Sequence, residues 1–319
     1  MRVLVTGATG FLGSALIRQL GSDQRYEARG AVRGGGSGCQ IDGDLITIGD
    51  IGPETDWSIA LKGIDVVVHA AARVHVMRDD APDPLIAFRH INTEGTLRLA
   101  EQAASAGVKR LIFISSIKVN GEATKPGKPF LADAPPAPTD PYGISKLEAE
   151  RGLSDICRNT GMDYVIIRPP LIYGPGVGAN FLAMMRWLRR GFPLPLGGVD
   201  NQRSFVALDN LIDLIVACIG SQSAANQVFL VSDGQDISTT ELIRCLGAAL
   251  GKPAKLVPVP CGILRTGAAL LGKSNVAGRL CDNLQVDIGK TQRLLKWKPP
   301  ISVHEGLRRT ALHFLNTES

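Results

Sequence analysis

The amino-acid sequence predicts an α/β fold in which a parallel sheet carries helices on both faces. Short runs rich in valine and isoleucine alternate with amphipathic helical patterns through the first half of the chain. These runs are nearly continuous in apolar residues, as in strands that are buried on both faces. Strand and helix patterns that alternate along the chain indicate βαβ units, and therefore a doubly wound sheet.

The elements follow one another in a simple order. The expected strands are Arg2–Thr6, Glu27–Val32, Val66–His69, Arg110–Ser115 and Tyr164–Ile167, and the expected helices are Leu12–Leu20, Thr93–Ser105 and Ser145–Thr160. After Ile167 the chain is rich in loops and its helical patterns become shorter. We therefore expect one domain over residues 1–172, to which later segments can return, and a smaller C-terminal α/β domain over residues 173–319.

Composition is that of an ordinary soluble globular protein. The chain has 319 residues, of which 45% are hydrophobic and 20% charged, with a mean hydropathy of +0.10. This length is sufficient for a full core. The N-terminus lacks the anatomy of a signal peptide, and the apolar stretch Cys261–Leu271 is too short and interrupted to span a bilayer. We expect a cytoplasmic protein without membrane insertion.

Charge and cysteine usage exclude several classes of partner. The net charge of +5 comes from basic residues that form no run, which argues against nucleic-acid binding and suits a small anionic substrate. The cysteines are far apart and form no CxxC, and the histidines lack metal-ligand spacing, so we expect neither disulfides nor a metal. The six cysteines are Cys39, Cys157, Cys218, Cys245, Cys261 and Cys281.

A glycine pattern follows the first expected strand and opens the first expected helix. Gly7, Gly10 and Gly13 lie on TGxxGxxG. Such glycines permit a tight turn and let the backbone approach a pyrophosphate, which the N–H groups and dipole of the helix N-terminus bind. The pattern predicts a Rossmann-type site for a dinucleotide cofactor. The alternative is a glycine-rich turn without a ligand.

The end of the second expected strand bears on the choice of cofactor. An acidic residue there would bind a ribose 2′-hydroxyl, but the sequence has Arg33 followed by glycines. A guanidinium suits a 2′-phosphate, so NADP(H) is favoured and NAD(H) stays possible. The alternative is that Arg33 is merely solvated. Asp50 is placed to reach the adenine side of the cofactor, or is a turn aspartate.

Tyr142 and Lys146 are four residues apart, so on a helix they project from the same face. A lysine ammonium, together with the charge of an oxidised nicotinamide, favours the phenolate of a tyrosine whose ordinary pKa is about 10. The pair is therefore predicted to act as a general acid/base. Ser116 is expected to hydrogen-bond the reacting oxygen, with Ser115 as the competing candidate.

Two further features have two readings each. The segment 126–141 contains six prolines and is expected to be a loop, either a substrate lid or a plain surface connection. Asn92 lies in an expected helix beside the sheet, where it either touches the sheet or site, or is exposed.

The motifs in this order resemble the extended short-chain dehydrogenase/reductase family, in particular its nucleotide-sugar branch of NAD-dependent epimerases, dehydratases and reductases. The resemblance spans essentially the whole chain. It rests on TGATGFLG (6–13), HAAA (69–72), FISSIKVNG (113–121), YGISK (142–146), RPPLIYGPG (168–176), RSFVALDNL (203–211) and LKWKP (295–299). It implies a cofactor-binding first domain, a C-terminal domain that binds a UDP-sugar or similar diphospho-sugar, and a homodimer.

The resemblance and the motifs together give the expected site. The expected catalytic residues are Ser116, Tyr142 and Lys146. The expected cofactor contacts are Gly7, Thr9, Gly10, Phe11, Leu12, Gly13, Arg33, Asp50, Ile51, Ala70, Ala71, Ala72, Asn92, Ser115, Tyr142, Lys146 and Pro169. The expected substrate contacts are Ser116, Lys118, Tyr142, Asn180, Arg203, Arg279 and Asp282, of which Asn180 and Arg203 match diphosphate contacts.

Departures from the family pattern guide the choice of reaction. The carboxyl pair that follows the catalytic hydroxyl residue in 4,6-dehydratases is replaced by Ile117 and Lys118, which argues against dehydration. Asn120 stands where 4-epimerases usually carry tyrosine, and Arg33 stands where they carry an acidic residue. The sequence looks most like the O-antigen 4-ketoreductases that form UDP-N-acetyl-quinovosamine-type sugars. We therefore expect reduction of a UDP-4-keto-6-deoxy-N-acetylhexosamine.

Two alternatives stay open. One is a UDP-sugar 4-epimerase, acting on UDP-glucose or UDP-N-acetylglucosamine, that retains its NAD. The other is a non-catalytic cofactor-binding regulator, since a fold alone does not dictate function.

Overall fold

A computed structural model describes residues 1–34, 44–74, 83–272 and 274–318. Its centre is a seven-stranded sheet in the order β3-β2-β1-β4-β5-β6-β9, and every neighbouring pair is parallel. The strands are β1 Arg2–Thr6, β2 Glu27–Val32, β3 Asp44–Thr47, β4 Val66–His69, β5 Arg110–Ile114, β6 Asp163–Arg168 and β9 Gln227–Leu230. The predicted doubly wound parallel sheet is confirmed.

Within the seven-stranded sheet, the structure differs from the expected strands at some ends and at the two sheet edges, and the strands of the separate pair Leu171–Tyr173 and Phe205–Ala207 were not predicted either. β5 ends at Ile114, so that Ser115 lies just beyond the strand, and β6 is longer by one residue at each end. β3 and β9 were not predicted. β3 is short and mostly exposed at one edge of the sheet, so it lacks the continuous apolar run by which a buried strand is recognised.

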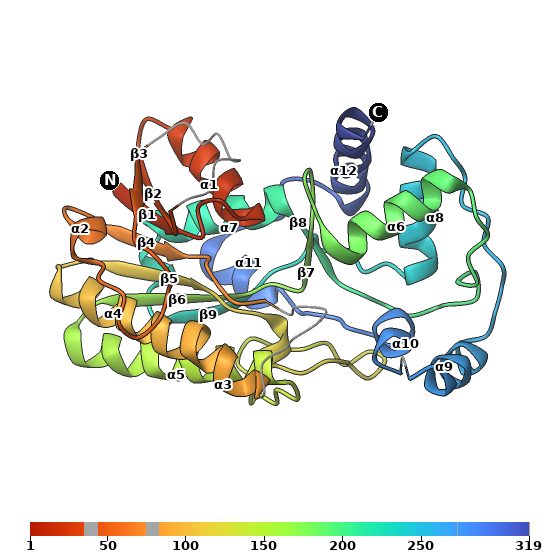
Figure 1. Ribbon diagram of the computed structural model, residues 1–319, viewed down its shortest axis with the longest axis horizontal. Coiled ribbons are helices and arrows are strands. Elements are labelled where there is room, and N and C mark those ends of the chain that lie inside the picture. The colour runs from red at the N-terminus through yellow and green to blue at the C-terminus, as the bar shows by residue number, and fades with distance from the viewer. Residues whose placement is uncertain (35–43, 75–82, 273, 319) are drawn as a thin grey trace.

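Helices cover both faces of the sheet (Figure 1). One face packs against α1 Phe11–Gly21, α7 Leu208–Gly220 and α11 Gly289–Leu295, and the other against α2 Ser58–Leu61, α4 Gly95–Ser105 and α5 Pro141–Thr160, with α3 Pro84–Phe88 beside α5. Alternate strand residues serve the two layers: Val3 and Val5 join the first core cluster, and Leu4 joins the second. A π-helical turn Arg89–Glu94 precedes α4, and 3₁₀ turns lie at Ile117–Val119 and Gln222–Ala224.

A second group of elements lies beside the sheet, on the right in Figure 1. It contains the parallel pair β7 Leu171–Tyr173 and β8 Phe205–Ala207, and the helices α6 Ala179–Arg190, α8 Thr239–Ala249, α9 Cys261–Leu270, α10 Ser274–Cys281 and α12 Val303–Thr317. A third core cluster joins most of these elements. The domain boundary at residue 172 stays a prediction, and α7, β9 and α11 return to the seven-stranded sheet.

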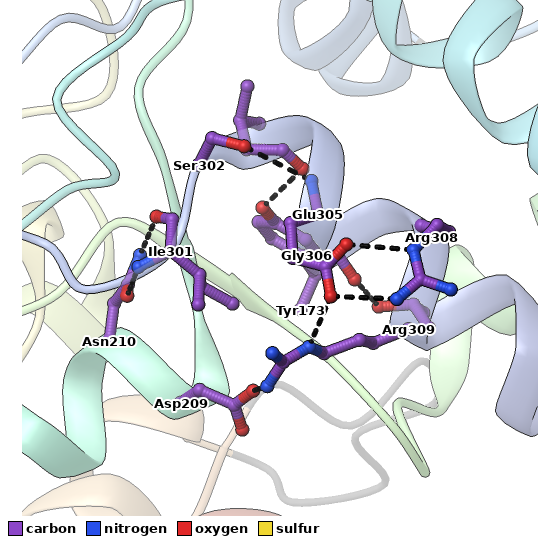
Figure 2. A network of polar contacts seen from close by, with 11 residues as sticks. Tyr173, Asp209, Asn210, Ile301, Ser302, Glu305, Gly306, Arg308 and Arg309 are labelled. Atoms are coloured by element: carbon purple, nitrogen blue, oxygen red, sulfur yellow. Dashed lines mark hydrogen bonds and ion pairs between the residues drawn. The ribbon is translucent and has the colours of Figure 1, made fainter.

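A polar network fastens the start of α12 to α7 and β7, as Figure 2 shows. Asn210 and Ile301 exchange two hydrogen bonds, and Arg309 donates to Asp209 at 2.7 Å. The buried Tyr173 hydroxyl donates to a backbone carbonyl in the first turn of α12 at 3.1 Å. These contacts hold the C-terminal helix against the junction of the two groups of elements.

The described residues also bear on the expectations for disulfides, metal sites and membrane-spanning helices. All the cysteines that the structure describes, from Cys157 onward, are free thiols, and Cys39 lies outside the described residues. Within the described ranges, no three histidine, cysteine or acidic side chains gather as a metal site would require. No helix in these same ranges combines the length and the apolar character needed to cross a bilayer.

Candidate active site

The glycine turn after β1 is built for close backbone approach. Gly7 has φ of +67°, and a Cβ on Gly13 would lie 2.1 Å from the Gly7 carbonyl oxygen. Gly10 precedes α1 as its N-cap residue, and no side chain caps the helix. The first N–H groups of α1 therefore stay available to an anion. The tight turn and the uncapped helix fit the pyrophosphate of a dinucleotide cofactor.

The turn lies where the strand order reverses. β1 has β2 on one side and β4 on the other, and ligands of open α/β sheets bind at such a switch point. A Cβ on Gly7 would lie 2.9 Å from the backbone nitrogen of Ala71, which follows β4. The carboxyl ends of β1 and β4 therefore meet closely, and only glycine fits between them.

A buried relay of hydrogen bonds fixes this meeting point. The Ala71 N–H donates to Thr6 Oγ1 at 3.2 Å, and Thr6 Oγ1 lies 2.7 Å from His69 Nδ1. His69 Nε2 lies 2.9 Å from Thr96 Oγ1, which itself donates to the Asn92 carbonyl. Because the Thr96 hydroxyl donates its one proton to the Asn92 carbonyl, it can only accept from His69. His69 therefore donates from Nε2 and accepts at Nδ1. Burial lowers the pKa of His69 to about 3, so the ring is neutral.

The remaining predicted cofactor contacts also lie at the carboxyl ends of strands. Thr9 is in the turn before α1, Phe11 and Leu12 are in its first turn, Ile51 follows β3, Ala70 and Ala72 follow β4, and Pro169 follows β6. The fold thus brings these residues to one edge of the sheet. Their contact with a cofactor stays a prediction.

Helix α5 carries Tyr142 and Lys146 on one face and begins four residues earlier than expected. Pro141 occupies the first turn, where its missing N–H costs nothing. Asp140 is the N-cap, and its Oδ1 accepts from the Gly143 N–H at 2.7 Å. Tyr142 is therefore held in the first turn of a capped helix, and Lys146 lies one turn later.

Lys146 is buried against the end of β5. Its Nζ donates to the Ile114 carbonyl at 2.8 Å and lies 4.2 Å from the ring centroid of Phe113. Burial lowers the pKa of Lys146 to about 7, and the charge of Glu150 opposes that shift. The amine is fixed in direction, and a modest change in its surroundings alters its protonation.

Burial also dominates the electrostatics of Tyr142. Burial raises its pKa to about 12, although a hydrogen bond with Ser116 lowers it and the charge of Asp140 raises it further. The expected preference for the phenolate depends on the charges of Lys146 and of an oxidised nicotinamide, and it stays a prediction. Tyr142 is protonated at neutral pH, which suits donation of a proton.

The two serines after β5 have different surroundings. Ser115 is buried, and its Oγ donates to Glu150 Oε1 at 2.5 Å. Ser116 is the N-cap of the following 3₁₀ turn, where its Oγ accepts from the Lys118 N–H at 3.2 Å and also reaches Tyr142. The two candidates therefore differ, because Ser115 is bound to Glu150 whereas Ser116 lowers the pKa of Tyr142.

A buried ion pair that sequence reasoning missed lies behind Ser115. Arg168 at the end of β6 and Glu150 on α5 each have side chains that are 5% exposed and form a bidentate pair at 2.5 to 2.9 Å. Arg168 also donates to Asn120, whose amide donates to the Leu131 carbonyl. The sequence did contain one signal of the role of Glu150. Tyr142, Lys146 and Glu150 follow one another at intervals of four residues, which places them on one face of the helix.

Asn92 and Lys118 are both held by protein partners. Asn92 is buried, exchanges hydrogen bonds with the backbone of Arg73 and donates to Ser145 Oγ at 3.1 Å. The exposed alternative for Asn92 is therefore wrong. Lys118, a predicted substrate contact, pairs with Asp140 and with Glu122. It braces the start of α5, and its contact with substrate stays a prediction.

Arg33 follows β2 and is exposed, with 79% of its side chain accessible. Its guanidinium lies 3.9 Å from the carboxylate of Asp50, which is more exposed still. The glycine-rich residues 35–43 that follow lie outside the described residues. A 2′-phosphate at Arg33 would thus also meet the negative charge of Asp50.

Three of the four predicted substrate contacts in the C-terminal part come together. Arg203 Nη1 donates to the Asp282 carbonyl at 2.9 Å, and burial and the charge of Arg279 lower the pKa of Arg203. The charge of Asp282 opposes this shift. The Asp282 carboxylate pairs with Arg265 of α9 at 2.5 Å. Asn180 is exposed in the first turn of α6.

The proline-rich segment 126–141 is not detached from the rest of the molecule. Phe130 exchanges backbone hydrogen bonds with Gln285 and Asp287, and the Ala137 N–H donates to the Val119 carbonyl. Lys290 pairs with Asp133 at 2.7 Å. The loop therefore lies against the chain between α10 and α11 and over the 3₁₀ turn, which disfavours a freely opening lid.

Comparison with known proteins decides the family. Residues 3–232 match the model of the NAD dependent epimerase/dehydratase family. The chain is 49% identical over 318 residues to a UDP-glucose 4-epimerase of Vibrio cholerae, covering 99% of this chain and 96% of the relative. The chain belongs to the NAD-dependent epimerase/dehydratase family.

Some further matches have lower identity. An N-acetyl-α-D-glucosaminyl-diphospho-ditrans,octacis-undecaprenol 4-epimerase of Escherichia coli O157:H7 is 26% identical, covering 97% of this chain and 93% of the relative. Among solved structures, a UDP-glucuronic acid 4-epimerase from Bacillus cereus in complex with NAD matches with a TM-score of 0.80 and 24% identity over both entire chains. A UDP-glucose 4-epimerase from Thermotoga maritima matches with a TM-score of 0.79 and 24% identity over both entire chains. The structural matches show the fold.

Proposed function

We propose that this chain is an NAD-dependent 4-epimerase of a UDP-sugar. The observation that carries the proposal is the pairing of Tyr142 with Ser116 beside the buried Lys146, at the sheet edge that also holds the glycine turn. The full-length identity of 49% with a UDP-glucose 4-epimerase supports it. The alternative from sequence therefore has more support than the ketoreductase that we first favoured.

The roles of the catalytic residues follow from their surroundings. Tyr142 exchanges the proton of the sugar 4-hydroxyl, and Ser116 hydrogen-bonds the same oxygen as its charge changes. Lys146 has a pKa of about 7 and is held by the Ile114 carbonyl, so its charge can favour either proton state of the tyrosine. When bound, NAD⁺ supplies a reversible acceptor for the hydrogen on C4 of the sugar.

Epimerisation also requires that the 4-keto sugar turn within the site. With Lys146 charged and an oxidised nicotinamide bound, Tyr142 would be a phenolate, which takes the proton as the 4-hydroxyl becomes a ketone and returns it when C4 is reduced from the opposite face. The reaction has no net redox change, so it gains from a cofactor that is retained. The same groups would serve a ketoreductase, which must exchange its cofactor at every turnover.

The cofactor in this proposal is NAD(H) rather than NADP(H). Arg33 was the reason to favour NADP(H), but its charge is offset by Asp50 at 3.9 Å. A second negative group beside Asp50 is unfavourable, whereas the 2′-hydroxyl of NAD can donate to a carboxylate. The structural neighbours crystallised with NAD agree with this choice.

The presence of Asn120, where 4-epimerases usually carry tyrosine, was the second reason to disfavour an epimerase, and the structure weakens that reason too. Its side chain is buried and bonded to Arg168 and to the Leu131 carbonyl. A residue held in this way supports the scaffold, so the absence of a tyrosine there says little about the reaction. Ile117 is buried and Lys118 is paired with carboxylates, so neither offers a carboxyl group for dehydration.

In this proposal the diphosphate of the UDP-sugar lies near Arg203 and Arg279, with Asn180 and Asp282 as further contacts. The protein works in the cytoplasm as a homodimer. A role in O-antigen or lipopolysaccharide precursor synthesis was predicted together with the ketoreductase and stays a prediction.

The experiment is direct. Purified protein is incubated with UDP-glucose or with UDP-N-acetylglucosamine and a catalytic amount of NAD, and the sugar anomeric signals are followed by proton NMR. Interconversion of C4 epimers, without accumulation of NADH, supports the proposal. No epimer from either sugar, together with stoichiometric oxidation of NADPH by a UDP-4-keto sugar, would establish the ketoreductase instead.

A further inference from the structure

The charges of the chain are unevenly distributed. Residues 179–199 and 242–281 contain nine of its 35 lysines and arginines and none of its 30 acidic residues, so the remainder carries 26 basic and 30 acidic residues. The nine are Arg186, Arg189, Arg190, Arg244, Lys252, Lys255, Arg265, Lys273 and Arg279. The two segments are strongly basic, although the protein as a whole is only moderately so.

These two segments lie side by side at the end of the molecule away from the seven-stranded sheet (Figure 1). Leu194 exchanges backbone hydrogen bonds with Lys255 and Val257, so the chain after α6 runs along the chain before α9. Lys252 Nζ donates to the Arg189 carbonyl at the end of α6. The end of α6 and the segment 252–257 therefore lie next to each other, each with exposed basic residues.

The same surface exposes large apolar side chains. Trp187 and Phe192 pack edge to face with ring centroids 5.9 Å apart, and both are half exposed. Helix α9 has no buried residue. It ends at Leu270, with Leu271 as its C-cap, and these two leucines are 84% and 74% exposed. We call the exposed residues Trp187, Arg190, Phe192, Lys255, Val257, Ile263, Leu270 and Leu271 the α6–α9 surface.

We propose that the α6–α9 surface binds the face of an anionic phospholipid bilayer. Aromatic rings and leucines insert at the headgroup boundary, and lysines and arginines around them attract anionic lipids. Glu318 pairs with Arg186 and Arg189, and Asp282 pairs with Arg265, so those cations are already balanced. A second copy of this chain fits less well than an anionic bilayer, because the exposed Arg190 and Lys255 of this surface would meet the same positive charges. This inference does not depend on the proposed reaction.

Attachment here would bring the candidate substrate contacts to the membrane. Arg265 of α9 pairs with Asp282, and the Asp282 carbonyl accepts from Arg203. The bilayer would then lie next to the residues proposed to hold a sugar diphosphate, while the seven-stranded sheet stays in water.

The test is sedimentation of the full chain with sonicated vesicles. Neutral phosphatidylcholine vesicles are compared with vesicles that also contain phosphatidylglycerol, at low salt and at high salt. We expect partitioning to the anionic vesicles to be at least about tenfold stronger and to fall with added salt, because the attraction is screened. Equal partitioning to both vesicles, or none to either, would overturn the proposal.

Two pairs of substitutions locate the surface. Leu270→Ser with Leu271→Ser, and separately Arg190→Gln with Lys255→Gln, change exposed side chains only. We expect each double variant to weaken partitioning by about tenfold or more. The basic pair should do so because each lysine or arginine contributes about fivefold, and the leucine pair because its apolar area no longer enters the headgroup boundary. Controls are Ile59→Ser, 71% exposed on α2, and Arg151→Gln on α5, which should partition like the wild type.

Sedimentation velocity tests the alternative that a second copy of this chain, rather than a bilayer, covers the α6–α9 surface. If the leucine pair instead covers a second copy of the chain, the wild type will associate as its concentration rises and the leucine variant will not. That result, without a loss of vesicle binding, overturns the proposal. Circular dichroism melts of every variant establish that the comparison is made between folded proteins.

Discussion

The Ser115 hydroxyl donates to the Glu150 carboxylate at 2.5 Å, and the two residues come from different elements that pack at the end of β5. Glu150 is at the same time bound to Arg168 by two further hydrogen bonds. Ser115 is thus committed to a buried ion pair, and its neighbour Ser116 is left to face Tyr142. One residue step along the chain separates a structural hydroxyl from a proposed catalytic one.

The two serines should therefore give opposite phenotypes. Ser115→Ala removes one donor from a buried carboxylate, so we expect a loss of about 1–2 kcal/mol in the free energy of unfolding, with kcat little changed. Ser116→Ala should lower kcat by a factor on the order of 10² and cost less stability, about 0.5 kcal/mol, because its Oγ caps only one 3₁₀ turn. Urea unfolding and steady-state kinetics measure both quantities. The reverse pattern would assign the catalytic hydroxyl to Ser115.

Tyr142→Phe should retain the fold and the affinity for cofactor but lower turnover by a factor on the order of 10²–10⁴, because it removes a positioned proton donor and acceptor. Cofactor binding is measured by fluorescence titration and turnover by the rate of epimer formation. Tyr26→Phe, half-buried just before β2 and so at the opposite edge of the sheet, is the matched control. Near-normal turnover in Tyr142→Phe would remove this residue from the mechanism.

Much of the fold could be predicted from sequence because its signals are local. The buried strands of the first half are continuous apolar runs, and the glycine turn follows β1 directly. β3 was missed because a short, exposed edge strand has no such run, whereas β9 was missed although it contains the apolar run Val228–Leu230, because it lies in a loop-rich region. The start of α5 was placed too late, since the helix-starting role of Pro141 was not used.

The site could be predicted in part for the same reason. Tyr142 and Lys146 are four residues apart, so their shared helix face is a local property. The roles of His69, Glu150 and Arg168 depend on partners that are far away in the sequence. Burial raises the pKa of Tyr142 in the structure. This effect could not be predicted, because the sequence does not show how completely the site is desolvated.

The neutral His69 should make stability depend on pH. In the folded protein it stays neutral down to about pH 3, whereas in the unfolded chain it takes a proton near pH 6.5. Acidification from pH 7 to 5 therefore favours the unfolded chain, and this residue alone should lower the free energy of unfolding by about 2 kcal/mol. In His69→Gln the decrease between these pH values should be smaller by that amount.

Denaturant unfolding at the two pH values measures the difference for each protein, so an overall loss of stability in His69→Gln cancels. His304→Gln, exposed on α12, is the control and should reproduce the wild-type difference. An unchanged pH dependence in His69→Gln would show that His69 is not held neutral.

The pairing of Arg33 with Asp50 predicts a cofactor preference that a substitution should shift. The wild type should bind NAD more tightly than NADP. Asp50→Asn removes the negative charge beside Arg33, so its affinity for NADP should rise about tenfold. Arg33→Gln in the Asp50→Asn background should abolish that gain. Calorimetric titration gives all four affinities, and tighter binding of NADP by the wild type would restore our original preference.

The fate of the hydrogen on C4 tests the central claim most directly. UDP-glucose carrying deuterium at C4 is incubated with the protein, a catalytic amount of NAD and an excess of unlabelled NADH and NADPH in solution. A 4-epimerase that retains its cofactor returns the same deuterium, so UDP-galactose should form with the label still at C4. Product that carries hydrogen from the dissolved NADH or NADPH, or no C4 epimer from UDP-glucose or from UDP-N-acetylglucosamine labelled in the same way, would contradict the account.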